Sequence, residues 1–416
     1  MNEPMDRVFA DWLRDGPDQG PREGLERTLA ATRHVSQRPA WAIPERWLPM
    51  QLTMQRAPAM RPALLLATVV LLVLALLGAA ILVGSQQRLP EPFGVARNGA
   101  IVFERDGDLF IADDLLGTDS LLVGGSERDL APKFSNQGDR IAFIRESDEG
   151  VGLLAVRADG SDLKVLGTFP NFDGFGWSPD GRALLINYTE TDPTGFRLSV
   201  ANADGSGSRE LDLGRPVDWA SWRPGGDHLA FRGQLADGRG AAFIADADGS
   251  NVRRLPMETS SQTDFEGLAW SPDGAHLSFM SDGRLGGAPG WQIGVADIDP
   301  DGVLTSHRRL RFDPESLDEM LPAWSPDSTQ FAFILEKKGI YQIAIARPDG
   351  TGLRPVGPRI VDRNGFGYAW SPDGKTLLIK ARMGAVSLWS VDAESGDVTE
   401  LDAPIDTIPT WQRLPA

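Results

Sequence analysis

Carboxylates are the most numerous side chains in this 416-residue sequence that could do chemistry. The segment DIDPDG matches the start of a calcium-binding loop, with oxygen donors at Asp297, Asp299 and Asp301 and a glycine at Gly302. The twelfth position of such a loop needs a bidentate Glu, and here it is Arg308. Because D-x-D-G recurs elsewhere in the chain, we interpret the segment as a hairpin turn. We expect no metal and no cofactor, and a bound Ca²⁺ is the alternative that stays open.

Other signatures of catalysis are missing from the sequence. It contains no G-x-S-x-G elbow, H-E-x-x-H motif, P-loop or dinucleotide fingerprint, so we expect no catalytic residue. The absence of cysteine excludes disulfides, zinc ribbons, iron–sulfur sites and a thiol nucleophile. Of the four histidines, His228 and His276 follow the same kind of turn, and we interpret them as turn-flanking surface residues. His34 precedes the apolar segment described below, and His307 is isolated.

Six carboxylates share a position relative to a repeated aromatic residue, four or five places before it. They are Asp129, Asp173, Asp218, Glu266, Glu319 and Asp406. Our hypothesis is that they form a ring that attracts a cation or a basic peptide, because converging like charges focus the electric field. The competing interpretation is that acidic residues are scattered through the chain, and that offsets of four and five point to opposite sides of a strand.

Four aromatic residues lie in the loops around these carboxylates: Phe172, Phe265, Trp291 and Phe366. They are candidate apolar anchors for a binding partner, since buried aromatic side chains often dominate binding energy. Burial against neighbouring structure is the competing interpretation.

The elements that must position these residues are set by a repeat. WSPDG occurs three times, and WSPDS, WRPGG and FSNQG are degenerate copies of it. The aromatic residues of the repeat are Phe134, Trp177, Trp222, Trp270, Trp324, Trp370 and Trp411. Their mean spacing is about 46 residues, which is the length of a four-stranded propeller blade. In each unit, Ser-Pro-Asp-Gly predicts a tight turn after the first strand, and D-G-S predicts a second turn before the fourth.

The seventh unit contains only its first strand before the sequence ends at Ala416. The three strands that it lacks are available in AIVFER, DLFIAD and SLLVGG, within residues 100–125. We therefore predict an all-β, seven-bladed propeller over residues 98–416, closed by one C-terminal and three N-terminal strands, which leaves no free sheet edge.

Strands that alternate in direction give the predicted propeller two different faces. The SPDG and DGS turns lie on one, which we call the turn face. The loops between second and third strands and between blades lie on the other, the variable face, where binding specificity usually resides. Those loops include residues 187–196, 256–266, 280–291 and 312–320.

The repeat resembles that of the TolB-like propellers, which are relatives of the WD-repeat proteins. It consists of W-S-P-D-G, an alternating strand and then D-x-D-G-S. The resemblance covers residues 100–416 and implies the propeller fold, which hosts binding, scaffolding and catalysis alike. TolB proteins carry a mixed α/β domain ahead of the propeller, and here an apolar segment occupies that place.

Residues 62–84 are uncharged and apolar, between Arg61 and Arg88. As a helix they would extend about 34 Å, enough to cross a bilayer core of about 30 Å. More arginines precede the segment than follow it, so the positive-inside rule predicts a cytoplasmic N-terminus and an exported propeller in a single-pass membrane protein. Residues 85–97 would be a linker.

The pattern of residues 1–61 predicts two short amphipathic helices around a Gly/Pro break. This segment has too few apolar residues to form a core. The formal charge of −17 resides in the C-terminal part, because residues 98–416 carry −19. Such acidity disfavours nucleic acid as a partner.

The sequence therefore predicts a membrane-anchored, non-enzymatic propeller that binds a protein or ligand on the exported side. One alternative is a transmembrane signalling protein that resembles membrane-bound anti-sigma factors, with residues 1–61 holding a cytoplasmic partner and the propeller as sensor. Their zinc-binding His/Cys pattern is absent here. A second alternative is a hydrolase or lyase acting at the mouth of the propeller pore.

Overall fold

The computed structural model describes most of the sequence after residue 92. The described ranges are residues 93–115, 117–147, 150–189, 196–236, 240–257, 265–282, 290–313, 315–316, 318–361, 366–383, 385–403 and 405–415. The predicted membrane span, the segment before it and the first part of the linker lie outside these ranges. Within them, no helix has the length and apolar character needed to cross a membrane.

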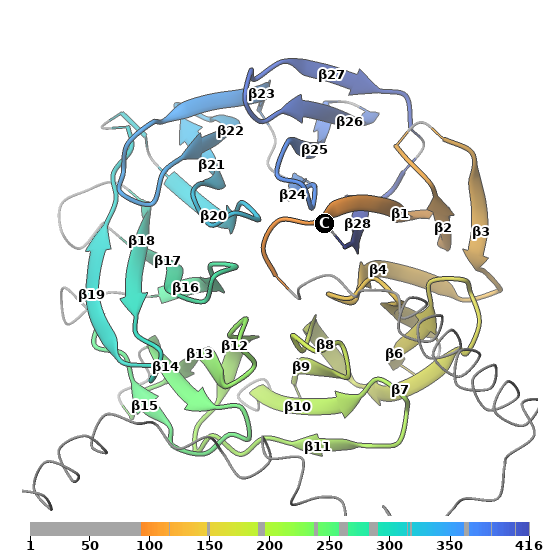
Figure 1. The fold of residues 1–416 in the computed structure, drawn as a ribbon, viewed down its shortest axis with the longest axis horizontal. Helices are drawn as coiled ribbons and strands as arrows, with labels where there is room; N and C mark the ends of the chain where they lie inside the picture. Colours follow the sequence, from red (N-terminus) through yellow and green to blue (C-terminus); the bar gives the residue numbers. More distant parts are fainter. Residues whose placement is uncertain are drawn as a thin grey trace, which may run out of the picture. The chain divides into compact units, whose positions relative to one another are not determined.

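The described residues form seven four-stranded antiparallel sheets arranged around a centre (Figure 1). Written from the innermost strand outward, blade 1 contains β28 (Thr410–Leu414), β1 (Arg97–Arg105), β2 (Asp108–Ala112) and β3 (Asp119–Val123). Blade 2 contains β4 (Arg128–Phe134), β5 (Arg140–Ser147), β6 (Gly150–Arg157) and β7 (Lys164–Phe169). Blade 3 contains β8 (Asn171–Trp177), β9 (Ala183–Thr189), β10 (Phe196–Asn202) and β11 (Ser208–Glu210).

The other four blades follow the same order. Blade 4 contains β12 (Val217–Trp222), β13 (His228–Gln234), β14 (Gly240–Asp246) and β15 (Arg253–Arg254). Blade 5 contains β16 (Phe265–Trp270), β17 (His276–Asp282), β18 (Trp291–Ile298) and β19 (Leu304–Arg309). Blade 6 contains β20 (Asp318–Trp324), β21 (Phe331–Lys337), β22 (Ile340–Ala346) and β23 (Arg354–Ile360). Blade 7 contains β24 (Gly367–Trp370), β25 (Thr376–Met383), β26 (Ala385–Asp392) and β27 (Val398–Leu401).

The first blade closes the ring as the repeat predicts. Its innermost strand β28 pairs with β1, and Trp411 lies opposite Ile101 in that ladder. The C-terminus of the chain accordingly lies beside β1 in Figure 1. Each of the other repeat aromatics lies opposite the equivalent residue of its second strand, for example Trp324 opposite Phe331. The predicted seven-bladed, all-β fold is confirmed.

The core lies between neighbouring blades, on both faces of the second and third strands. Phe143, Phe231, Phe279, Phe331 and Phe333 are among the largest fully buried side chains. Strands covered on both faces read as continuous apolar runs, which explains segments such as FAFIL in β21.

Hydrogen bonds between turns confirm the predicted turn face. The amide of Ala158, in the turn after β6, donates to the carbonyl of Asp139, in the turn before β5, at 3.0 Å. Ala203 and Arg182 make the equivalent bond in blade 3 at 2.8 Å. The two turns of a blade therefore lie side by side, on the face opposite the variable loops.

Candidate functional site on the variable face

On the turn face, carboxylates hold their own turns. Asp159, Asp204, Asp248 and Asp349 each accept a hydrogen bond from the amide two residues later, at 2.8 to 2.9 Å. Hydrogen bonds from the Ser or Thr hydroxyl at that position and then from its amide lower the pKa of all four carboxyls. Part of the acidic excess is therefore required by turn geometry rather than by a ligand.

Arginines of the outermost strands join neighbouring blades on this face. Each donates to a backbone carbonyl in the last turn of the next blade: Arg253 to Asp301, Arg308 to Pro348 and Arg354 to Glu394, at 2.9 to 3.0 Å. The sequence analysis did not identify these arginines. Their signal is a basic residue a few places after each D-G turn.

The degenerate repeat WRPGG replaces the hydrogen bond within its turn with a contact to the next blade. In the four WSPD copies the Ser hydroxyl donates to the Asp carboxylate, as Ser178 does to Asp180 at 2.7 Å. In blade 4 both partners are changed, to Arg223 and Gly225. The Arg223 guanidinium is buried and donates to the carbonyls of Gly274, Pro300 and Asp299 in blade 5, at 2.9 to 3.0 Å.

The DIDPDG segment is a hairpin turn whose carboxylates have partners within the protein. Asp297 lies 2.7 Å from His276 Nδ1, and it also accepts hydrogen bonds from Ser306 and Arg308. Asp299 accepts from the amide of Val303 at 2.8 Å. Within the described residues, no group of three His, Asp or Glu side chains is placed to hold a metal ion.

The two turn-flanking histidines differ from the surface positions that the sequence predicts. His228 is buried, with Nδ1 2.9 Å from an Asp227 carboxylate oxygen, because Gly302 of the next blade lies against its ring. His276 is partly buried and stacks on Trp324, with ring centroids 5.9 Å apart. The expectation of surface exposure was therefore wrong for His228.

On the variable face, the innermost strands of blades 2 to 6 each contain a β-bulge, and the predicted carboxylates of these strands differ in burial. Asp129, five places before its aromatic, is fully buried and accepts two parallel hydrogen bonds from Arg145, at 2.7 and 2.8 Å. Asp173 and Glu266, four places before theirs, are exposed. The side chain of Asp218 lies outside the described part of the structure.

Glu319 is the second buried member of the set. One carboxylate oxygen accepts hydrogen bonds from the amides of Phe312 and Asp313, at 3.0 and 3.3 Å, and the other has no partner among the described residues. Burial raises the pKa of Glu319 to about 7, against the opposing effect of those amides. This carboxylate holds the loop after β19 in place.

The candidate aromatic anchors lie mostly against the blades. Phe172 is 6.0 Å from the rings of both Phe169 and Phe175, and Trp291 and Phe366 pack on the core between blades 5, 6 and 7. The side chain of Phe265 lies outside the described part. Packing accounts for the other three rings.

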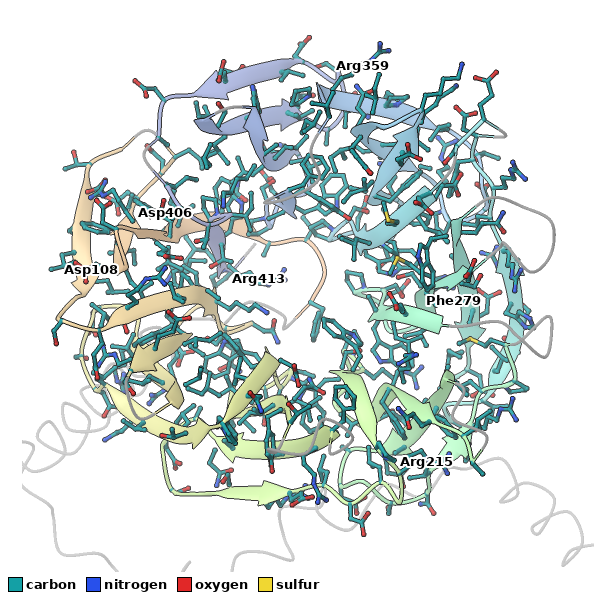
Figure 2. The ribbon with its side chains drawn as sticks, turned by 180° about the vertical axis from the view of Figure 1, so that it is seen from behind. Asp108, Arg215, Phe279, Arg359, Asp406 and Arg413 are labelled. Carbon is teal, nitrogen blue, oxygen red and sulfur yellow. The ribbon has the colours of Figure 1, made fainter. Side chains whose placement is uncertain are left out.

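Asp406 of the predicted set lines a cavity. Together with Glu104, Asp106 and Arg128 it borders an open pocket of about 600 Å³ between blades 1 and 2. Figure 2 marks Asp406 beside the strands of blade 1. Its carboxylate accepts a hydrogen bond from the amide of Asp106 at 2.8 Å, so it is oriented by the β1–β2 turn.

Glu104 was not identified from the sequence, yet it is the buried group of this pocket. It is 4% exposed, and its pKa is raised by burial and then by the charge of Asp406, against the opposing effects of Arg128 and Lys380. Strand register places it level with Ile144 and Ile334 of other blades. The same position holds Asn187, Arg232 and Lys380 in blades 3, 4 and 7, so the repeat alone does not single out Glu104.

The chain was compared with known proteins and structures. No protein-family model matches it. It is 40% identical over 102 residues to the Tol-Pal system protein TolB of Gluconobacter oxydans, a segment equal to 23% of this chain and 21% of that protein. Part of the propeller is therefore similar in sequence to a TolB protein. Because the match spans about a fifth of the relative's length, the partners of the whole relative do not transfer directly.

Two solved structures share the propeller fold at low identity. An oligogalacturonate lyase from Vibrio parahaemolyticus aligns with a TM-score of 0.55 at 14% identity, over 75% of this chain and 96% of that chain. A prolyl endopeptidase structure aligns with a TM-score of 0.56 at 13% identity, over 76% and 51%. Likeness at this level concerns the fold and not the chemistry of any site.

Proposed function

We propose that this protein is a membrane-anchored, non-enzymatic module that binds a protein or peptide outside the cytoplasm through the variable face of its TolB-like propeller. The observation that carries the proposal is the difference between the two faces. On the turn face, carboxylates, serines and arginines pair with one another. On the variable face, Glu319 and Glu336 are buried, each with one carboxylate oxygen that has no partner among the described residues, and the buried Glu104 lies 3.8 Å from Arg128. Val361, which is 82% exposed against 46% for Val303 on the turn face, also lies there.

The exposed apolar side chains favour a protein partner over a small molecule. Val361, directly after β23, is 82% exposed. Ile340 is also exposed and lies near it, because the next residue, Tyr341, pairs with Ile360. Leu321 on the innermost strand of blade 6 is 53% exposed. Apolar side chains beside unsatisfied polar groups are common where proteins bind one another.

The described chain enters the propeller on the turn face. The amide of Ala96 donates to the carbonyl of Pro372 in the SPDG turn of blade 7 at 2.9 Å, and Arg413 donates to the carbonyl of Gly94. Residues 94–96 therefore contact the turn face directly before β1 begins.

The name of the Gluconobacter relative places that protein in the Tol-Pal system. By analogy, we propose an envelope protein as the partner. The signalling alternative shares the exported propeller and differs in requiring a cytoplasmic partner for residues 1–61, which co-purification also detects.

Co-purification from native membranes tests the proposal. The full chain, solubilised in mild detergent, is compared with the Val361→Glu variant and with Val303→Glu, which changes an exposed valine on the turn face. A partner that is lost with Val361→Glu and retained with Val303→Glu supports the proposal. Equal retention by both variants, or equal loss, would contradict binding through the variable face.

A further inference from the structure

Glu104 is a nearly buried carboxylate with an incomplete set of partners. Among the described residues, none donates a hydrogen bond to it; Arg128 Nη2 is 3.8 Å away, and Lys380 acts on it as a second nearby cation. That guanidinium is 63% exposed and forms its shorter contact, 2.9 Å, with Glu146. A buried carboxylate without good partners is destabilising, so its presence requires a reason.

The carboxylate lies at the wall of the pocket between blades 1 and 2. Three carboxylates and one guanidinium line that pocket, which gives it a net negative charge. Lys380 adds a cation nearby: its ammonium donates to the backbone carbonyl of Asp406 and its charge lowers the pKa of Glu104, but its side chain does not line the pocket. A cation that entered the pocket would meet Glu104 and Asp406 together.

The remaining lining of the pocket is suited to an aliphatic chain. Leu130 and Ala131 of β4 form one wall, and the volume of about 600 Å³ is sufficient for an amino-acid side chain with its neighbouring backbone. Lysine side chains commonly lay their methylene groups on apolar surface while the ammonium reaches polar groups. The combination of apolar wall and unsatisfied carboxylate matches that shape.

We propose that this pocket receives a lysine side chain of the protein partner, with the ammonium paired to Glu104 and Asp406 and the methylene groups on Leu130 and Ala131. The proposal rests on the proposed function and names the chemistry that its partner presents. A calcium ion fits less well, because it needs six to eight oxygen ligands and Arg128 lies on the same wall.

Ligand-observed NMR titration of the full chain in detergent tests the pocket directly. The probe is N-acetyl-lysine methylamide, and N-acetyl-norleucine methylamide is its uncharged counterpart. Glu104→Gln removes the charge with little change of shape. Glu400→Gln removes an exposed carboxylate from the outer strand of blade 7 and is the matched control.

We expect the lysine probe to bind in the millimolar range and the norleucine probe to bind at least tenfold more weakly. Glu104→Gln should weaken the lysine probe about tenfold, and Glu400→Gln should change its affinity less than twofold. Equal binding of both probes, or no effect of Glu104→Gln, would overturn the proposal. So would binding of calcium chloride that depends on Glu104 while the lysine probe fails to bind.

The two proposals fail in distinguishable ways. If the probe does not bind but co-purification still depends on Val361, the variable face binds a partner without this lysine. Thermal unfolding of Glu104→Gln excludes misfolding as a cause, because removal of an unpaired buried charge should raise Tm rather than lower it.

Discussion

Arg223 of blade 4 donates through Nε to the carbonyl oxygen of Gly274 in blade 5, across a distance of 3.0 Å. Arg223 stands where the four WSPD repeats have the serine of the turn, and Gly225 stands where they have its aspartate partner. The turn has thus lost an internal hydrogen bond and gained a contact between blades. A propeller depends on such contacts because each blade buries its apolar faces only against its neighbours.

Substitution of Arg223 should destabilise the propeller strongly. Arg223→Ala removes three hydrogen bonds from a buried guanidinium and leaves three carbonyls without that donor, so we expect a loss of about 2–4 kcal/mol in the free energy of unfolding. Urea denaturation measures it. Arg209→Ala is the control, because its guanidinium makes a single exposed contact with Asp248 at 3.4 Å and should cost less than about 1 kcal/mol. Similar losses in both variants would contradict this role of Arg223.

The repeat tryptophans should differ according to their indole partners. Trp324 Nε1 donates to the carbonyl of Ala269 and lies near the hydroxyl of Ser278, at 3.2 and 3.1 Å, whereas Trp270 Nε1 is buried without a partner. Both indoles are equally buried, so replacement by Phe removes similar volume. Trp324→Phe should therefore destabilise by about 1–2 kcal/mol more than Trp270→Phe. Chemical denaturation that ranks them equally would refute the assignment.

Asp129 should behave as a structural residue. Asp129→Asn breaks a buried, two-bond pair with Arg145 and should cost about 2–3 kcal/mol in unfolding free energy. Asp173→Asn changes an exposed carboxylate of the same predicted set and should stay within about 0.5 kcal/mol. Thermal unfolding of both variants provides the comparison. A stable Asp129→Asn protein with weakened partner binding would instead assign Asp129 to the binding site.

Glu319 should make stability depend on pH. Its pKa is near 7 in the folded protein, because burial raises it from an ordinary value of 4.5. The folded state then holds more protons than the unfolded state between these values, so stability falls as pH rises through that window, by about 3 kcal/mol in all. Glu319→Gln should remove this loss, and Glu266→Gln, at an exposed site, should not. Unfolding curves from pH 4.5 to 8 that keep the same slope for Glu319→Gln and the unmodified chain would contradict the assignment.

The fold could be predicted from the sequence because each repeat contains the residues that form its own turn. Ser178 and Asp180 bond to each other within one turn, and so do their equivalents, so the signal is local in the sequence. The strand around Trp411 pairs with β1 and completes blade 1. The position of a carboxylate four or five residues before a repeat aromatic did not predict whether its side chain is buried or exposed. A bulge in the innermost strand changes which way a side chain points, and spacing alone does not show a bulge.

The pocket at Glu104 was beyond the reach of local patterns for another reason. Two of its three carboxylates, Glu104 and Asp406, are about three hundred residues apart in the sequence and meet only because the ring closes. The turn at Asp106 and the strand that begins at Arg128 complete the pocket from two blades. The proximity of Glu104 and Asp406 follows from the pairing of β28 with β1, so it can be predicted only once that pairing is known.

Site-specific photo-crosslinking in living cells tests the central claim most directly. A photoreactive amino acid is placed at Val361 on the variable face and, in a second variant, at Val303 on the turn face. Both positions are exposed valines, at 82% for Val361 and 46% for Val303, so either side chain can reach a partner. We predict a discrete crosslinked partner from Val361 and none, or a different one, from Val303. The same partner captured equally from both positions, or capture from Val303 alone, would contradict binding through the variable face.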